Sequence, residues 1–359
     1  MAAAISSMSD LIASVPALLG FVPRDSFVLI SSINQPDGRR KFGAVQRIDL
    51  AQLTEAPTIW ASRLAANLAD LSVAQLFGVL VPASSGAAPH ATVLPLRPTM
   101  RTVATTLLQR GLTELDIVFV SQFAAGTPWQ SYLDGTRRGT LPDPAGTAAA
   151  AIATASGYTI AASREDLAMR YTPAPDADRA RLRPLINAAA RTARLEGARS
   201  AATRARLARA DGAIRAASEG ELPTDDTVMA DLVATFAASV LRHALLAAPS
   251  ADISIGTENL ALHLWRLTPE PYASELATVI ATHAYCRGDG AGASCALEAA
   301  ATPVPLGHLL GRCLDHSLPH NKLRQAMNEA AQKVRDQLSD ATTAPAPSAS
   351  PHATDQPER

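Results

Sequence analysis

Several features by which protein classes are recognised are scarce in this sequence. Only 4% of its 359 residues are aromatic, and three are cysteine. No basic segment precedes the apolar N-terminal stretch, so Cys286, Cys295 and Cys313 are expected to be reduced thiols of a cytoplasmic protein. No apolar run reaches 18 residues, so no transmembrane helix and no membrane partner are expected.

Lysine is also scarce, being limited to Lys41, Lys322 and Lys333, so arginine supplies most of the 32 basic residues. Arginine suits phosphate and carboxylate better than lysine does, because its planar guanidinium can donate two hydrogen bonds to one such group. Alanine, glycine and proline are plentiful too, however, which favours GC-rich coding as the cause. The formal net charge of −1 argues against a globally basic nucleic-acid binder. With 47% hydrophobic and 18% charged residues, the chain is expected to form two globular domains.

Motifs for common catalytic and cofactor sites are absent. The sequence has no G-x-S-x-G, H-E-x-x-H or G-x-G-x-x-G, and it indicates no particular cofactor. One combination of side chains could offer metal ligands on neighbouring helices: His283, Cys286, Cys313, His316 and His320. Cysteine in an alanine-rich helix is more often a small buried apolar residue, so we expect no metal site.

The stretch from Leu11 to Ile33 combines a short apolar helix, a turn and a strand. Gly20 and Pro23 are placed to end the helix. The unbroken apolar run Phe27–Ile30 indicates a strand covered on both faces, in the middle of a sheet.

A β-α-β-α-β pattern follows over residues 42–121, which indicates parallel strands with right-handed crossovers. The first hairpin should add an antiparallel pair. We therefore predict a three-layer α/β domain over residues 1–172, with a mixed but mostly parallel sheet.

No convincing strand follows Thr172-Pro173-Ala174-Pro175, which marks the predicted domain boundary. Helices are expected at residues 178–196, 198–217, 224–247, 257–267, 272–286, 291–301, 306–316 and 320–337. Helix pairs of tetratricopeptide-like form, without a regular repeat, predict an all-α helical array over residues 173–337. The composition of residues 338–359 predicts a disordered tail.

Two motifs carry a resemblance. The first is Pro16-Ala17-Leu18-Leu19-Gly20-Phe21, followed by Pro23 and Asp25-Ser26 before a strand. The second is Leu264-Trp265 ahead of a helix that ends in Arg287-Gly288-Asp289-Gly290-Ala291. In this order they resemble an actinobacterial family of domains of unknown function, DUF4192, over roughly Ser9 to Met327. The resemblance implies an α/β front half and a helical back half, and no particular activity.

Ligands of open α/β sheets bind outside the carboxyl ends of the strands. Candidate ligand-binding residues are therefore those at the predicted strand ends and in the opening turn: Asp49, Ser84, Ser85, Ser121, Gln122, Arg24, Asp25 and Ser26. A serine–histidine pair in this domain would need His90. Asp25-Ser26 is also explained as a side-chain turn leading into a strand, which we favour.

Three functions stay open. The favoured one is a non-enzymatic platform whose helical domain binds another protein, because no catalytic constellation is present; pull-down with the folded chain would test it. The alternative is a small-molecule or nucleotide-binding protein, possibly a hydrolase, with its site at the strand ends. The third is nucleic-acid binding through the helices over residues 179–215. This stretch contains ten arginines and two acidic residues, Glu196 and Asp211. We favour a solvated amphipathic face there, so a nucleic-acid partner is not expected.

Overall fold

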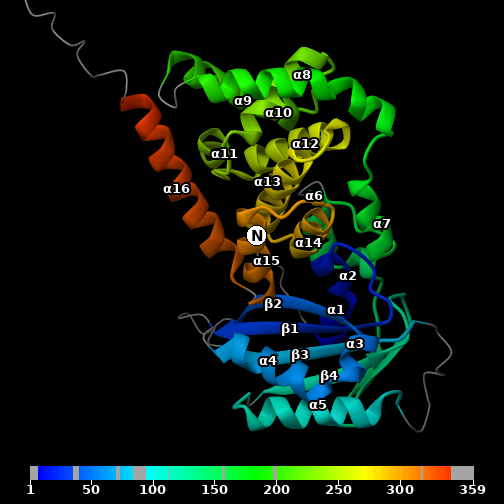
Figure 1. Ribbon diagram of the computed structural model, residues 1–359. Coiled ribbons are helices and arrows are strands. Elements are labelled where there is room, and N and C mark those ends of the chain that lie inside the picture. Colours follow the sequence, from blue (N-terminus) through cyan, green and yellow to red (C-terminus); the bar gives the residue numbers. More distant parts are fainter. Residues whose placement is uncertain are drawn as a thin grey trace, which may run out of the picture.

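The computed structural model describes residues 7–34, 40–69, 73–83, 94–112, 114–155, 158–196, 200–316 and 318–340. A sheet occupies the front half of the chain and helices stack above one of its faces (Figure 1). A mixed sheet followed by helices was predicted, and this arrangement is confirmed. The predicted domain boundary at residue 172 stays a prediction.

Six strands form one sheet in the order β2-β1-β3-β4-β5-β6. They are β1 (Ser26–Asn34), β2 (Arg40–Asp49), β3 (Val73–Val81), β4 (Leu115–Val120), β5 (Pro128–Ser131) and β6 (Arg138–Thr140). Among the strands of the described residues, β3 and β4 alone pair in parallel, and the other four pairs are antiparallel. The prediction of a mostly parallel sheet is therefore wrong. The reason is that β3 pairs with the free edge of β1 rather than with β2, so the crossover after β2 joins strands that are not neighbours.

Strand β1 is an interior strand, next to the edge strand β2, and it is buried on both faces as predicted. Phe27, Val28, Leu29 and Ile30 are each at most 2% exposed. Phe27 and Leu29 pack with α3 (Leu50–Glu55), α4 (Pro57–Ala69) and α5 (Arg97–Gln109) on one face. Val28 and Ile30 belong to the larger apolar cluster on the other face, which includes α1 (Met8–Ala13) and α2 (Val15–Leu19). The alanine-rich helix α6 (Ala148–Ala155) packs against α2.

Nine helices form the helical half among the described residues. They are α8 (Asp176–Leu195), α9 (Ala201–Ser218), α10 (Asp226–Ala237), α11 (Ser239–Leu245), α12 (Ala251–Leu267), α13 (Tyr272–Arg287), α14 (Gly290–Glu298), α15 (Pro305–Asp315) and α16 (His320–Asp340). The single helix predicted over 224–247 is two helices that meet at 92°. Helix α16 continues three residues beyond the predicted end at 337, and residues 341–359 of the predicted tail lie outside the described residues.

Helices α12 and α13 form the centre of this half, and α16 runs along one side of it (Figure 1). Gly256 allows α12 to approach α9 closely, because a Cβ atom at this position would clash with the Ile214 carbonyl oxygen. Within the described ranges no single helix is long and apolar enough to cross a membrane, and only the bent pair α10–α11 passes that test when its two helices are joined.

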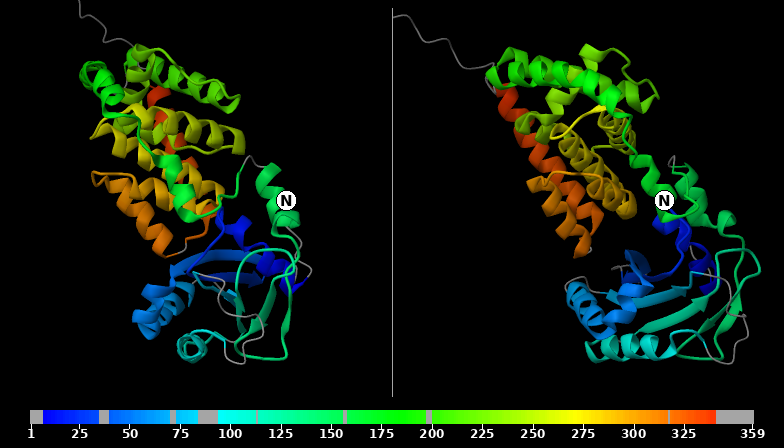
Figure 2. Two further views of the ribbon diagram at one scale, coloured as in Figure 1. Left: turned by 90° about the vertical axis from the view of Figure 1, so that its right-hand side faces the viewer. Right: turned by 45° about the vertical axis from the view of Figure 1, so that its right-hand side comes forward.

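A connecting segment, residues 158–175, joins the two halves along one side of the molecule (Figure 2). It contains α7 (Arg164–Ala168) and the 3-10 helix η2 (Met169–Tyr171). The predicted strand over 158–161 is reduced to one parallel bridge between Phe21 and Ala161. The predicted cap at Ser163 is present, since its hydroxyl accepts from the Asp166 amide at 3.0 Å.

Candidate ligand-binding site

The strand-end residues predicted from the sequence are only partly brought together. Strand β1 runs antiparallel to β2 and β3, so its first residue, Ser26, lies beside Asp49 and Val81 at their carboxyl ends. Ser121 and Gln122 follow β4, which is two strands away from β1. Ser84, Ser85 and His90 lie outside the described residues.

Arg47, which the sequence gave no reason to single out, joins the members of this group. Its Nε donates to the Ser26 hydroxyl at 2.8 Å, and its guanidinium forms an ion pair with Asp49. The Ser26 hydroxyl in turn donates to the Arg24 carbonyl at 2.5 Å. These side chains satisfy one another, as expected for a turn that leads into a strand.

Arg24 and Asp25 form an exposed turn ahead of β1. Asp25 has φ of +45°, a conformation that aspartate tolerates better than most residues. Its carbonyl accepts from the Leu50 amide at 3.0 Å. The turn therefore ties the start of β1 to the end of β2.

The two resemblance motifs, far apart in the sequence, meet in space. Gly20 ends α2 with φ of +77°, and a Cβ atom there would lie 4.0 Å from the Asp289 carboxylate. Gly20 and Val22 also exchange backbone hydrogen bonds with Ala161 of the connecting segment. The connecting segment thus lies directly beside both motifs.

The second motif shapes the turn between α13 and α14. Gly288, with φ of +93°, ends α13. The Asp289 side chain then caps α14 by accepting from the Gly292 amide at 2.7 Å. A Cβ atom at Gly292 would clash with that carboxylate, so any other residue there would require the Asp289 side chain to shift. Burial raises the pKa of Asp289, and the Gly292 hydrogen bond opposes this.

A cavity of about 410 Å³ lies between the connecting segment and helices α12 and α13, and we name it the junction cavity. The connecting segment contributes Tyr158, Thr159, Ala161, Asp166, Leu167 and Arg170 to its wall. The helices contribute Ile255, Glu258, Asn259 and Arg287. Arg287 is therefore both a motif residue and a wall residue.

A buried carboxylate held between two arginines lies in the wall of the junction cavity. The Glu258 side chain is 3% exposed, and Arg287 donates to its Oε2. Arg170, whose side chain is 40% exposed, donates to Oε1 over 3.4 Å. Because a buried charge without a partner is strongly destabilising, Arg287 is the principal counter-ion that allows Glu258 to lie here.

Arg287 also binds Tyr158. Its Nε donates to the phenol oxygen, and its guanidinium carbon lies 5.4 Å from the ring centroid, within cation–π range. Burial alone would lower the pKa of Arg287, but Glu258 and Tyr158 outweigh it and the pKa lies above its ordinary value. Burial raises the pKa of the Tyr158 phenol.

Behind Arg287, Ser254 and His283 form a buried pair. The Ser254 hydroxyl lies 3.2 Å from His283 Nδ1, and Nε2 of the ring lies 3.2 Å from the Leu245 carbonyl. Burial lowers the pKa of His283 to about 4, and the Arg287 charge adds to this. Ser254 is 1% exposed, and neither residue lines the junction cavity. The pair has the composition of a nucleophile and a base, but its geometry is that of a satisfied core contact.

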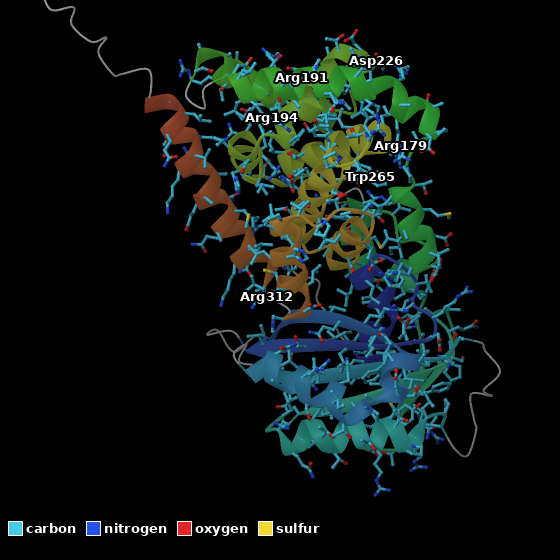
Figure 3. The ribbon with its side chains drawn as sticks, in the orientation of Figure 1. Arg179, Arg191, Arg194, Asp226, Trp265 and Arg312 are labelled. Atoms are coloured by element: carbon cyan, nitrogen blue, oxygen red, sulfur yellow. The ribbon has the colours of Figure 1, made fainter. Side chains whose placement is uncertain are left out.

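The arginine-rich stretch lies at the end of the helical half away from the sheet, where Figure 3 labels Arg179, Arg191 and Arg194. At least four of its arginines form ion pairs with nearby carboxylates: Arg179 with Asp176, Arg181 with Asp226, Arg206 with Glu196 and Asp231, and Arg209 with Asp231. These pairs offer a structural role for at least four of the ten arginines that the sequence concentrates here.

Two of the histidines considered as metal ligands have other partners. His283 Nδ1 lies 3.2 Å from the Ser254 hydroxyl, and His316 Nδ1 lies 3.1 Å from the Asn67 side chain. Burial raises the pKa of the Cys286 thiol to about 11. Across the described residues, His, Cys, Asp and Glu side chains gather nowhere in a group of three or more that could hold a metal ion.

Most of the junction cavity was missed by sequence reasoning. Arg287 belongs to a motif, but Tyr158, Arg170 and Glu258 carry no motif signal. One weak signal existed. Ser254 and Glu258 on α12, and His283 and Arg287 on α13, are each four residues apart, which places two polar side chains on the same face of each helix.

Comparison with curated proteins and comparison with solved structures each found no match. A family model, that of the domain of unknown function DUF4192, matches residues 9–322, which is most of the chain. That range includes both motifs and every residue of the junction cavity. The chain therefore belongs to the DUF4192 family.

Proposed function

We propose that the protein binds a small polar molecule in the junction cavity. The observation that carries the proposal is the buried Glu258 carboxylate, held by Arg170 and Arg287 in the wall of a cavity of about 410 Å³. Buried ion pairs are weak contributors to stability, so a packed apolar contact would serve the fold as well. Their place beside an open cavity is what favours a role in binding.

The size and position of the cavity support the same function. Small-molecule sites are commonly about 300–1,000 Å³ in volume and occur preferentially between domains. The junction cavity lies between the helical half and the connecting segment, which spans the predicted domain boundary, and it is beside the motif residue Arg287. We place the ligand among cytoplasmic metabolites, because the sequence predicts a cytoplasmic protein.

The strand-end site predicted from the sequence is less favoured. Ser26, Arg47 and Asp49 are satisfied by one another. Asn259 and Thr159, by contrast, are exposed at the junction cavity, where a ligand can reach them. The small-molecule function considered from the sequence is therefore retained, but its proposed site moves to the cavity.

A thermal-shift screen of the full chain with metabolites, followed by calorimetry of the hits, tests this proposal. A ligand present at 100 times its Kd should add about 2.7 kcal/mol to the free energy of unfolding. The shift should be lost in Arg170→Ala and weakened in Asn259→Ala, whose exposed side chain has little effect on folding. Arg183→Ala, on the exposed face of α8, is the matched control and should keep it. A screen without hits, or hits that bind Arg170→Ala as tightly as the native chain, would refute the proposal.

The protein-interaction platform favoured by the sequence stays a prediction. So does the expectation that nucleic acid is not a partner, although the ion pairs of the arginine-rich stretch leave fewer arginines for phosphate. A salt-independent affinity for DNA and RNA probes would remove nucleic acid from consideration.

A further inference from the structure

We propose that the ligand of the junction cavity is a small zwitterion, a free α-amino acid with an apolar side chain, whose carboxylate binds Arg170 and whose ammonium binds Asp166. This inference rests on the proposed function and names the ligand class for that site. It follows from which charged groups in the wall are already engaged and which are not.

Arg287 and Glu258 are engaged with the protein. The three guanidinium nitrogens of Arg287 contact Tyr158, Ser254 and Glu258. Glu258 has one oxygen on Arg287 and the other facing Arg170. Within the wall these two side chains neutralise each other, so they form the floor of the site and are not its free charges.

Arg170 has donors to spare. Its contact with Glu258 spans 3.4 Å, which is longer than the usual 2.7–3.2 Å of an N–H···O bond. Its side chain is 40% exposed, whereas that of Arg287 is 10% exposed. A carboxylate in the cavity can therefore form the bidentate pair that guanidinium favours, without breaking the Arg287–Glu258 contact.

Asp166 is the matching free anion. Its Oδ2 accepts from the Ser163 hydroxyl at 3.0 Å, which fixes the orientation of the carboxylate. Among the described residues it forms no ion pair, although it lines the cavity. A ligand ammonium would supply the missing counter-charge.

The spacing of Asp166 and Arg170 suits groups that are close together in the ligand. Asp166 lies on α7 and Arg170 lies four residues further on, in the adjoining 3-10 helix η2, and both residues line the same cavity. An ammonium and a carboxylate on one carbon atom can lie between the two side chains.

Charge balance argues against an anion or a cation alone. The wall holds two cations, Arg170 and Arg287, and two anions, Asp166 and Glu258. A purely anionic ligand would lie beside the unpaired Asp166, and a purely cationic one beside Arg170. The remaining wall includes Ala161, Leu167 and Ile255, so the side chain of the ligand meets an apolar surface.

The test is calorimetry and thermal shift on the full chain with leucine, methionine and phenylalanine as probes. Each is compared with its N-acetyl derivative, which lacks the ammonium, and with its amide, which lacks the carboxylate. At least one parent amino acid should bind with saturation, and both blocked derivatives should bind at least tenfold more weakly. Asp166→Asn should weaken the parent at least tenfold and abolish its preference over the 2-hydroxy acid of the same side chain. Asp178→Asn, an exposed carboxylate on α8, should change neither.

The outcomes separate the two proposals. If the amino acids do not bind but the metabolite screen yields an anionic or neutral ligand that depends on Arg170, the zwitterion is wrong and the proposed function stands. If amino acids bind equally well with the ammonium blocked, the assignment of Asp166 is wrong. If neither the amino acids nor the screen gives binding to folded protein, both proposals fail.

Discussion

At the scale of single residues, the core of the helical half is unusually polar for a helix pair. Ser254 and Glu258 on α12 face His283 and Arg287 on α13, and each of the four has a partner. His283 is fully buried and neutral, with its pKa lowered to about 4 by burial. The proton it must accept in acid is therefore taken up more readily by the unfolded chain.

We expect His283 to make the protein sensitive to mild acid. The pKa of His283 in the folded protein, about 4, lies below the ordinary value of 6.5, so between these pH values the unfolded chain binds a proton that the folded chain does not. The stabilisation linked to the neutral ring is therefore fully present above pH 6.5 and is lost as the pH falls toward 4. The loss is of the order of 3 kcal/mol, at 1.36 kcal/mol per pKa unit. Urea unfolding at several pH values between 7 and 4 measures it, with His283→Gln as the comparison. Equal pH dependence in the two proteins would contradict the expectation.

At the scale of elements, β1 supports the sheet as an interior strand that is buried on both faces. It pairs with β2 on one side and β3 on the other, and its alternate residues supply both apolar clusters. Its first residue, Ser26, is buried too, but its contacts are polar and local.

Leu29→Ala should therefore lower the free energy of unfolding by about 2–5 kcal/mol, since it leaves a cavity in a packed core. Ser26→Ala should cost no more than about 1–2 kcal/mol, because it removes only the hydrogen bonds with the Arg24 carbonyl and the Arg47 side chain. Chemical denaturation of both variants checks the ranking. A neutral Leu29→Ala would mean that Leu29 is not part of a tightly packed core.

The sequence was informative about which elements exist and less so about how they pair. The burial of β1 followed from Phe27–Ile30, a run without alternation, and most helices of the back half followed from apolar spacing and proline. The strand pairing was predicted wrongly because β3 pairs with the free edge of β1. Residue patterns do not distinguish that edge from the free edge of β2. The break at Ala238 was missed because it contains neither glycine nor proline. The junction cavity was missed because its walls come from segments about 100 residues apart.

At the scale of the whole molecule, the connecting segment holds the two halves together. The Tyr171 ring packs edge-on against Trp265, with the centroids 6.5 Å apart, and its hydroxyl donates to the Gly292 carbonyl at 3.0 Å. An ion pair between Arg164 and Glu298 lies on the same side. One apolar cluster extends from the sheet face into α12 and α13. The halves therefore share buried surface that neither would keep alone.

We expect the native chain to unfold in one transition because of this shared core, and Tyr171→Ala to uncouple the halves. Tyr171 is 7% exposed, so its truncation should cost about 3–5 kcal/mol and divide thermal unfolding into two transitions. Tyr171→Phe keeps the ring and removes only the hydrogen bond to Gly292, so it should cost about 1 kcal/mol and leave one transition. Scanning calorimetry distinguishes these outcomes. Two separate transitions in the native chain, or one unchanged transition in Tyr171→Ala, would show that the halves are not coupled through this residue.

The contact between Tyr171 and Trp265 joins the connecting segment to α12, and these two elements also form the wall of the junction cavity. Tyr171→Ala should therefore also weaken the binding of any ligand in the cavity. Leu29 is not part of the cavity wall, so Leu29→Ala should leave the ligand affinity of the folded protein unchanged.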